Sequence, residues 1–396
     1  MNNKITNLAR RFNIGAEIES ITPLGNGLIN DTFKVTTRGS SPDYVLQRIN
    51  DAVFKDVALL QHNIQSVTGH IRKKYQSQGL PDIDRRVLRF VNVTGSDQTY
   101  LVDEEKYWRM SVFIPDSTTF DTVNPEYSYC AGKAFGNFEA LLADLNEPLG
   151  EPIPDFHNME FRSRQLKDAV KEDKAGRLAI PEVKALVDEI ASYDWEMCKA
   201  ERMYREGVLP KRICHCDTKV NNMLFDANGQ VLCVIDLDTV MPSFVFSDFG
   251  DFLRTAGSNL PEDDPDTENI RFRMDIFKAF AKGYLESAGA FLTKTETENL
   301  PYGAMLFPYM QAVRFLTDYL NGDTYYKIKY PEHNLVRTRN QLALFKAIMS
   351  HREEMSAYIE VKEVEISEVA GKAHDLLDSS RLWVVSEGSG LVHTEG

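Results

Sequence analysis

Hydrophobic and polar positions alternate along the first hundred residues in the manner of β-strands. Residues 18–37 alternate on both sides of the glycines in "PLGNG", which predicts two strands joined by a turn, and "DYVLQRI" predicts a third strand. The next segment is different, because Leu60, Ile64 and Val67 recur at helical spacing. The segments "RVLRFVNVTG", "TYLVDEE" and "YWRMSVFI" then predict further strands, with a break at Pro115. The chain therefore begins with a β-rich unit that contains one helix.

From about Glu126 the hydrophobic spacing becomes that of helices. The segment "IFKAFAKGYLESAGA" carries an apolar stripe along one helical face, and "TKTE" fits a capping box at the start of another helix. The β pattern in this part is a hairpin, made of "NMLFD", a turn at Asn228 and Gly229, and "QVLCVID". A cleft between two such lobes is the natural place for a ligand. We therefore predict an α+β fold with a β-rich N-lobe at residues 1–114, a mainly helical C-lobe at 115–366 and a peripheral tail at 367–396.

Composition limits the kinds of partner. The formal net charge of −14 argues against a general nucleic-acid-binding protein, and no run of about 18 apolar residues indicates a membrane-spanning helix. We therefore expect neither a nucleic acid nor a membrane among the partners. The five cysteines are scattered and odd in number, which does not fit a disulfide framework and favours a reducing, cytoplasmic location. No second Cys or His cluster accompanies Cys214, His215 and Cys216, so we expect buried thiols there rather than a zinc site.

One stretch of the C-lobe, "ICHCDTKVNNMLFDANGQVLCVIDLDT", concentrates polar side chains around an apolar strand. Asp236 ends the apolar run that begins at Val231, where a charge costs several kcal/mol unless something pairs with it. A metal ion is one such partner. Asp217 precedes the hairpin, Asn222 follows five residues later, and Asp236 closes the next strand, which is the spacing of a phosphoryl-transfer site.

This stretch resembles the catalytic and metal loops of the aminoglycoside phosphotransferase-like kinases, relatives of the protein kinases. The resemblance implies a two-lobed protein-kinase-like fold, ATP as co-substrate and Mg²⁺ as cofactor. It implies that Asp217 orients the attacking hydroxyl and accepts its proton, while Asn222 and Asp236 hold the metal. It also implies that His215 packs and hydrogen-bonds the loop rather than acting in catalysis. Lys219 is expected to stabilise the charge of the transferred phosphoryl group, with a solvent-facing lysine as the alternative.

The resemblance extends to the nucleotide site of the N-lobe, although the residues there depart from the family pattern. Gly25 and Gly27 are expected to cover the phosphates, and Asn30 stands where the family has a third glycine. By position, the adenine is expected against the connector between the lobes, near Phe113 and Ile114.

The phosphate-binding lysine of the family would fall at Gln47, and the next helix lacks the glutamate that would pair with it. We expect the neutral Gln47 to replace the pair, held by a polar side chain at 61–63, because a lone buried charge would be costly. Arg48 should point to the opposite face of the strand. Asp238 stands where the kinases often have a glycine. We expect it to contact metal or substrate, or to cap the following turn.

Substrate selection is expected in the C-lobe. The segments "QAVRFLTDYLNGD" and "KYPEHNLVRTRNQ" bring polar side chains onto otherwise apolar helices. The alternatives are a surface ion pair in the first segment and solvated arginines in the second. The candidate substrate-binding residues are Arg314, Asp318, Tyr319, His333, Asn334 and Arg337.

A closer resemblance, to the bacterial N-acetylhexosamine 1-kinases, rests on "GNGLIND", "YVLQ", "HCDTKVNN", "IDLDTVMP", "DFGD", "RFLTDYL" and "KYPEHNLVRTR". It covers about residues 12–360 and implies that the anomeric hydroxyl of N-acetylglucosamine or N-acetylgalactosamine is phosphorylated to the 1-phosphate. The alternative is a kinase of the same fold acting on choline, homoserine or an aminoglycoside, for which the acidic loop at 261–268 could serve a cation. A pseudokinase or binding module would have lost the acids that this chain retains.

Overall fold

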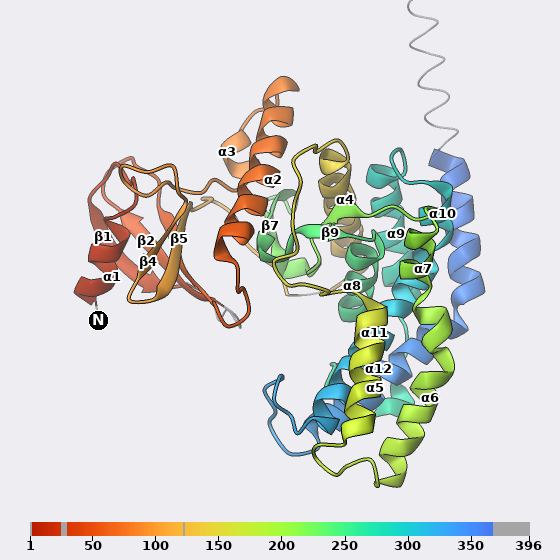
Figure 1. Ribbon diagram of the computed structural model, residues 1–396. Coiled ribbons are helices and arrows are strands. Elements are labelled where there is room, and N and C mark those ends of the chain that lie inside the picture. Colours follow the sequence, from red (N-terminus) through yellow and green to blue (C-terminus); the bar gives the residue numbers. More distant parts are fainter. Residues whose placement is uncertain (1, 25–29, 122, 367–396) are drawn as a thin grey trace, which may run out of the picture.

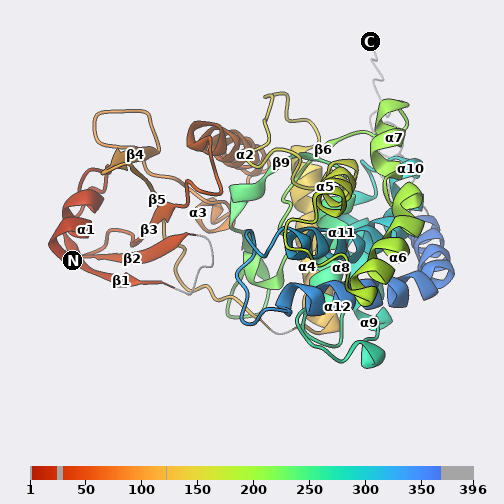
Figure 2. The same cartoon turned by 60° about the horizontal axis from the view of Figure 1, so that its bottom comes forward.

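The computed structural model describes residues 2–24, 30–121 and 123–366. Within these ranges the chain forms two lobes that lie side by side (Figures 1 and 2). The first lobe is a five-stranded antiparallel sheet in the order β1-β2-β3-β5-β4, and the second is built mainly of helices, so the predicted fold class is confirmed. The strands are β1 (Ile18–Pro23), β2 (Asp31–Thr37), β3 (Tyr44–Ile49), β4 (Tyr100–Asp103) and β5 (Lys106–Val112).

One predicted strand is wrong. The segment "RVLRFVNVTG" makes isolated bridges instead, from Phe90 to Ser111 and from Val93 to Phe12. The reason is that β4 pairs with β5 from Lys106 to Arg109, so this segment can pair only with the last residues of β5. The other predicted strands of the N-lobe are present.

Helix α2 (Val57–Ser77) connects the two lobes, and Figure 1 shows it between the sheet and the helices of the C-lobe. Asp56 caps the helix, because its carboxylate accepts the backbone N–H of Leu59 at 2.9 Å. The predicted apolar face of Leu60, Ile64 and Val67 is fully buried and packs in one cluster with side chains of α4. The other face of the sheet is covered by α1 (Asn2–Ala9), and the short α3 (Ile83–Arg86) follows α2.

The C-lobe core forms where two helices approach very closely. A Cβ at Gly132 of α4 would lie 2.1 Å from the carbonyl oxygen of Phe280, and one at Gly283 of α9 would lie 2.2 Å from that of Tyr129. Only glycine permits this backbone contact. A further helix spans 352–366. The other α-helices of this lobe are α4 (Pro125–Leu142), α5 (Met159–Glu172), α6 (Pro181–Met197), α7 (Lys199–Arg205), α8 (Phe246–Ala256), α9 (Met274–Ala288), α10 (Lys294–Glu298), α11 (Leu300–Leu320) and α12 (His333–Ser350).

Two pairs of short antiparallel strands interrupt the helices, and the loops next to them hold Asp217, Asn222 and Asp236. β7 (Met223–Phe225) pairs with β8 (Val231–Val234), which confirms the predicted hairpin, and Gly229 adopts the positive φ of 75° that its turn needs. β6 (Arg212–Cys214) pairs with β9 (Met241–Ser243). The predicted capping box is also present at the start of α10. The predicted N-lobe boundary at residue 114 falls in the segment between β5 and α4, and the division into domains stays a prediction.

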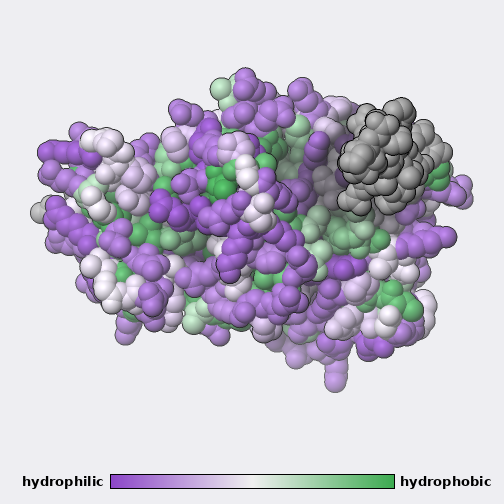
Figure 3. Space-filling view, turned by 90° about the horizontal axis from the view of Figure 1, so that it is seen from above, coloured by the Kyte–Doolittle hydropathy of each residue, from purple (hydrophilic) through white to green (hydrophobic). Residues whose placement is uncertain are grey.

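The surface agrees with the composition. In Figure 3 most of the visible face is hydrophilic, and hydrophobic residues gather only in small patches. No helix within the described ranges combines the length and the apolar character needed to cross a bilayer. All five cysteines are free thiols. The predicted tail at 367–396 lies outside the described residues.

Candidate active site

The loop after β6 is held in shape by a buried carboxylate from the first turn of α8. Asp248 accepts the backbone N–H of His215 at 2.8 Å and that of Cys216 at 2.7 Å. Cys216 has a φ of 62°, a left-handed conformation that costs a β-substituted residue about 1–3 kcal/mol. The ring of His215 is fully buried, and its Nε2 lies 2.9 Å from the carbonyl oxygen of Ile235. His215 therefore packs and hydrogen-bonds the loop, as expected.

Asp248 has a buried acidic neighbour on α4. Glu139 accepts a hydrogen bond from the hydroxyl of Tyr284 and lies with Cys214 and Asp248 in a group whose polar atoms are within 4.8 Å of one another. Burial, and then the charge of Asp248, raise the pKa of Glu139 well above its usual value. A protonated Glu139 can donate to the Asp248 carboxylate, so this group is a neutral acid paired with one carboxylate.

We expect Asp248→Asn to destabilise the protein by about 1.5–3 kcal/mol, because an amide offers one acceptor oxygen where two backbone N–H groups bond to a charged carboxylate. Glu139→Gln should change stability little, since a glutamine keeps the donor to Asp248 and the acceptor for Tyr284. Urea unfolding of both variants checks this. A large loss in Glu139→Gln would mean that Glu139 is ionised.

The three residues of the phosphoryl-transfer motif come together below this loop. The side-chain nitrogen of Asn222 donates to the carbonyl oxygen of Asp217 at 2.8 Å and to its carboxylate at 3.2 Å. This orientation leaves the amide oxygen of Asn222 as the atom that can face a metal. The backbone N–H of Ile235 bonds to the carbonyl oxygen of Asn222 at 2.9 Å, which brings Asp236 beside it.

Asp236 is reachable by solvent, although the sequence suggested a buried charge. Neighbouring protein atoms nevertheless partly desolvate its carboxylate. That desolvation, followed by the charges of Asp238 and Asp217, raises the pKa of Asp236 to about 6. The carboxylates of Asp217 and Asp236 and the amide oxygen of Asn222 are ligand types that Mg²⁺ prefers, so this set fits the metal that the resemblance implies. Asn222 and Asp236 would hold it, and bound Mg²⁺ would neutralise charge on the phosphates.

Lys219 lies next to Asp217, with its ammonium 2.5 Å from the carboxylate. Burial lowers the pKa of Lys219, but the charges of Asp217 and of Asp251 on α8 outweigh it, and the net shift is upward. The lysine therefore stays charged beside the candidate base. Asp251 is itself paired with Arg254 at 3.2 Å, which extends the polar network along α8.

The N-lobe residues meet the C-lobe through Asp238. Asn30 donates to one carboxylate oxygen of Asp238 at 2.7 Å, and Nη1 of Arg109 lies 2.5 Å from the other. Nε of Arg109 donates to Gln47 at 3.0 Å. Asp238 therefore contacts the N-lobe, which was not among the roles considered for it.

The expectation that a side chain at 61–63 holds Gln47 is wrong. Gln47 donates to Thr32 of the neighbouring strand at 3.3 Å, whereas Gln61 and Asn63 bond to Thr99 and to the carbonyl oxygens of residues 150 and 240. Gln61 therefore bonds to the N-lobe and Asn63 to the C-lobe, and neither of these hydrogen bonds involves Gln47. Arg48 forms an ion pair with Asp31 on the opposite face, as expected.

The predicted adenine position lies at the end of β5. Phe113 bonds through its N–H to the carbonyl oxygen of Asp43, and the ammonium of Lys34 lies 4.2 Å from its ring centroid. Ile114 is buried. Gly25 and Gly27 lie outside the described residues, so their predicted contact with phosphates stays a prediction.

Several predicted substrate residues hold a loop. The carboxylate of Asp318 accepts the backbone N–H groups of residues 324, 325 and 326 at 2.8–3.0 Å, and Asn334 donates to it at 2.9 Å. Both side chains are buried. Tyr319 is also buried, with the guanidinium of Arg177 at 4.1 Å from its ring centroid. Asp318 and Asn334 therefore shape the loop after α11, and a direct contact with substrate stays a prediction.

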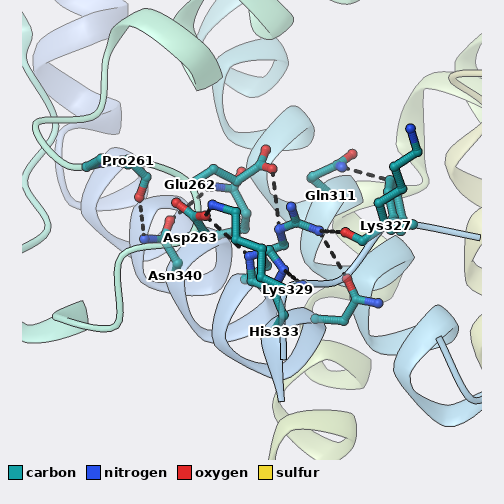
Figure 4. A network of polar contacts seen from close by, with 12 residues as sticks. Pro261, Glu262, Asp263, Gln311, Lys327, Lys329, His333 and Asn340 are labelled. Atoms are coloured by element: carbon teal, nitrogen blue, oxygen red, sulfur yellow. Dashed lines mark hydrogen bonds and ion pairs between the residues drawn. The ribbon is translucent and has the colours of Figure 1, made fainter. Parts of the chain in front are cut away.

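The acidic loop at 261–268 is tied to basic groups of α12 and the segment before it, as Figure 4 shows. Asp263 pairs with Lys329 at 2.7 Å and with the buried His333 at 3.3 Å. Glu262 pairs with Arg254 at 2.6 Å and lies 4.0 Å from Nε of Arg337. The carboxylates of Glu262 and Asp263 therefore already have cationic partners.

Arg314 lies in a group of arginines and aromatic rings beside the catalytic loop. Its guanidinium carbon is 5.6 Å from the ring centroids of both Phe156 and Tyr326. Phe156 packs against the buried Cys216, which precedes Asp217. Burial, followed by the charge of Arg314, lowers the pKa of Arg162 on α5 to about 10. Arg162 and Arg314 therefore bring two positive charges together beside Phe156.

Sequence reasoning missed Arg109, Arg162 and Asp248 as members of the site. A single arginine within the apolar strand "YWRMSVFI" was a usable signal for Arg109, because a buried strand position needs a partner for its charge. Asp248 lay within the quoted "DFGD". Arg162 gave no signal, since an arginine on an amphipathic helix is ordinarily solvated.

Comparison with known proteins gives the same architecture. An aminoglycoside phosphotransferase from Alicyclobacillus acidocaldarius is similar with a TM-score of 0.53 at 14% identity, over 91% of this chain and 95% of that chain. Plasmodium vivax ethanolamine kinase is similar with a TM-score of 0.52 at 12% identity, over 83% and 84%. An aminoglycoside phosphotransferase with ADP bound is similar with a TM-score of 0.51 at 12% identity, over 87% and 98%. At these identities the likeness shows the fold alone.

A family model described as the phosphotransferase enzyme family matches residues 20–291, which is more than half of the chain. The matched range contains Asp217, Asn222 and Asp236 in the spacing and geometry described above. The chain therefore belongs to the phosphotransferase enzyme family, as a two-lobed small-molecule kinase.

Proposed function

We propose that this kinase transfers the γ-phosphoryl group of ATP, with Mg²⁺, to the anomeric hydroxyl of N-acetylglucosamine or N-acetylgalactosamine. In this proposal Asp217 aims the hydroxyl and takes its proton, Lys219 stabilises the transferred group, and Asn222 and Asp236 hold the metal. The sugar lies toward Arg314 and Arg337.

The observation that carries the proposal is the positive charge of Arg162 and Arg314, which both contact Phe156, a residue packed on the cluster that contains Cys216. Arg162 donates hydrogen bonds to the side chain of Gln165 and to the carbonyl oxygen of Phe156. Arg314 donates to the side chain of Gln311. Within the described residues these acceptors are all neutral oxygens. Two adjacent guanidiniums without a paired carboxylate repel a cation. They suit a neutral polyol, whose hydroxyl and acetyl oxygens accept from them.

The imidazole beside these arginines supports the same reading. Burial, and then the charges of Arg314, Arg162 and Arg254, lower the pKa of His157 well below its usual value. The neutral ring lies 3.1 Å from the hydroxyl of Ser247 and stacks on Phe156. A neutral imidazole and aromatic faces are groups that a sugar ring can use.

Cationic acceptors are the second candidate, because proteins of this fold include an ethanolamine kinase and aminoglycoside phosphotransferases. A cation is recognised by acidic and aromatic groups. The carboxylates of Glu262 and Asp263, which could have served it, are paired with Arg254 and Lys329. The charges of Arg162 and Arg314 therefore favour the neutral sugar.

An acceptor panel tests the proposal. ADP formation is measured with ATP and Mg²⁺ against N-acetylglucosamine, N-acetylgalactosamine, choline, ethanolamine, homoserine and an aminoglycoside, and NMR identifies the phosphorylated atom. We expect turnover with the two hexosamines and phosphate on C1. Turnover with a cationic acceptor alone, or phosphate on another carbon, would contradict the proposal.

Arg314→Gln should raise KM for N-acetylglucosamine by about 10- to 100-fold, since a hydrogen bond from a charged donor contributes about 1.5–3 kcal/mol. KM for ATP should hardly change. Arg339→Gln is the matched control, because Arg339 is on the adjacent α12 but pairs with Glu182 at the surface. Equal KM values for N-acetylglucosamine in the two variants would remove Arg314 from the sugar site.

A further inference from the structure

The N-lobe lacks the ion pair that presents a positive charge to the nucleotide in kinases of this fold. Gln47 is neutral, and the residues of α2 that could pair with it are turned toward other partners. Even so, a kinase that binds ATP needs donors for the phosphate oxygens, because their negative charge must be balanced.

Arg109 supplies a charge at the neighbouring position of the sheet. It stands directly opposite Gln47 in the antiparallel register of β3 and β5. The bond from its Nε to Gln47 fixes the plane of the guanidinium, and Gln47 is in turn fixed by Thr32 on β2. The side chain is only 3% exposed.

The guanidinium is also close to the other groups that handle phosphate. Its ionic partner Asp238 follows the metal-binding Asp236 by two residues and accepts from Asn30, just after the glycine-rich turn. Arg109 and Asn30 of the N-lobe therefore meet at one carboxylate, two residues from Asp236.

Nη1 of Arg109 has an ionic partner but no aligned hydrogen-bond acceptor. It lies 2.5 Å from the Asp238 carboxylate, and both atoms of this pair are buried without a hydrogen bond in the described residues. Buried donors nearly always have an aligned acceptor, so this pair leaves Nη1 with bonding capacity that a phosphate oxygen can use.

We propose that Arg109 on β5 binds the phosphates of the nucleotide and that Asp238 of the C-lobe is its partner when no nucleotide is bound. The missing pair is thus rebuilt from two other elements. In this protein the cation is on β5 instead of β3, and the acid is in the segment after β8 instead of on α2. This inference rests on the proposed kinase function only in requiring a nucleotide, and it is independent of the acceptor.

The test measures phosphate recognition separately from catalysis. Affinities for ADP and for adenosine are determined by calorimetry without acceptor and with EDTA, for Arg109→Gln, Asp238→Asn and the double variant. The double variant is essential, because either single change leaves a buried charge unpaired and destabilises the protein. Circular dichroism and thermal unfolding verify that each protein is folded.

We expect Arg109→Gln and the double variant to bind ADP about 10- to 100-fold more weakly, the effect of one lost charge-assisted contact, and to bind adenosine as the wild type does. Asp238→Asn should bind ADP as tightly as the wild type or more tightly, because it frees Arg109. Arg48→Gln is the matched control: this neighbouring arginine points to the other face and should leave both affinities unchanged.

Two results would overturn the inference. If ADP and adenosine weaken together in the double variant, the pair only holds the lobes in place. If ADP affinity falls in Arg48→Gln and not in Arg109→Gln, β3 provides the phosphate-binding charge. Neither result depends on which alcohol is phosphorylated, so failure here is distinguishable from failure of the hexosamine proposal.

Discussion

Asp217→Asn is expected to lower kcat by about 10²–10⁴-fold, the contribution of a positioned general base. The amide keeps the size of the side chain, and Asn222 can still donate to the backbone carbonyl of residue 217. The variant can no longer take the proton of the acceptor hydroxyl, and Lys219 loses its ionic partner. Steady-state kinetics with N-acetylglucosamine, together with ATP affinity by calorimetry, measure the two effects separately.

An anomeric hydroxyl is more acidic than the other hydroxyls of a sugar, so in the proposed reaction Asp217 would act mainly by aiming the oxygen at the γ-phosphate. ATP affinity should therefore persist in Asp217→Asn while kcat falls. Asp84→Asn is a suitable control, because this carboxylate is exposed in the N-lobe and pairs with Arg72. Normal turnover by Asp217→Asn would exclude the base mechanism.

Asp236→Asn is expected to abolish the effect of Mg²⁺ on nucleotide binding and to lower kcat by about 10³-fold or more, because a metal contributes several kcal/mol to charge stabilisation. The substitution removes a carboxylate whose charge is costly in the free protein, since desolvation and the charges of Asp238 and Asp217 already raise its pKa. The variant should therefore remain folded.

The measurement is ADP affinity with Mg²⁺ and with EDTA. In the wild type Mg²⁺ should tighten ADP binding, whereas in Asp236→Asn the two values should coincide. With EDTA alone the two proteins should bind ADP alike, which serves as the internal control. An equal gain from Mg²⁺ in both proteins would mean that Asp236 is not a ligand.

Contacts between distant parts of the chain decided which partners the predicted substrate-binding residues have. Asp318 looked like the partner of Arg314 because both lie on one helix, but its carboxylate bonds to the loop at 324–326, while Arg314 bonds to Gln311. Helical spacing predicts which side chains share a face. It does not predict whether an acid on that face will turn toward a neighbouring side chain or toward backbone N–H groups of a loop that folds back onto it.

The motif itself was readable from the sequence for a physical reason. Asp217, Asn222 and Asp236 lie on one hairpin and its flanking loops, so their distances follow from local chain geometry and turn chemistry. The strand alternation and the helical stripe of α2 were readable in the same way, because each depends on residues that are near in sequence.

Only the tertiary structure decided how charges are balanced between the lobes. Asn30 meets Asp238 across 208 positions of sequence, and Arg109 meets the same carboxylate from a different strand. Arg162 and Arg314 come together from two separate helices, and burial together with the charge of Arg314 lowers the pKa of Arg162. No local pattern encodes such contacts, because they arise when the lobes and helices pack and buried polar groups must find whatever partner the packing brings within reach.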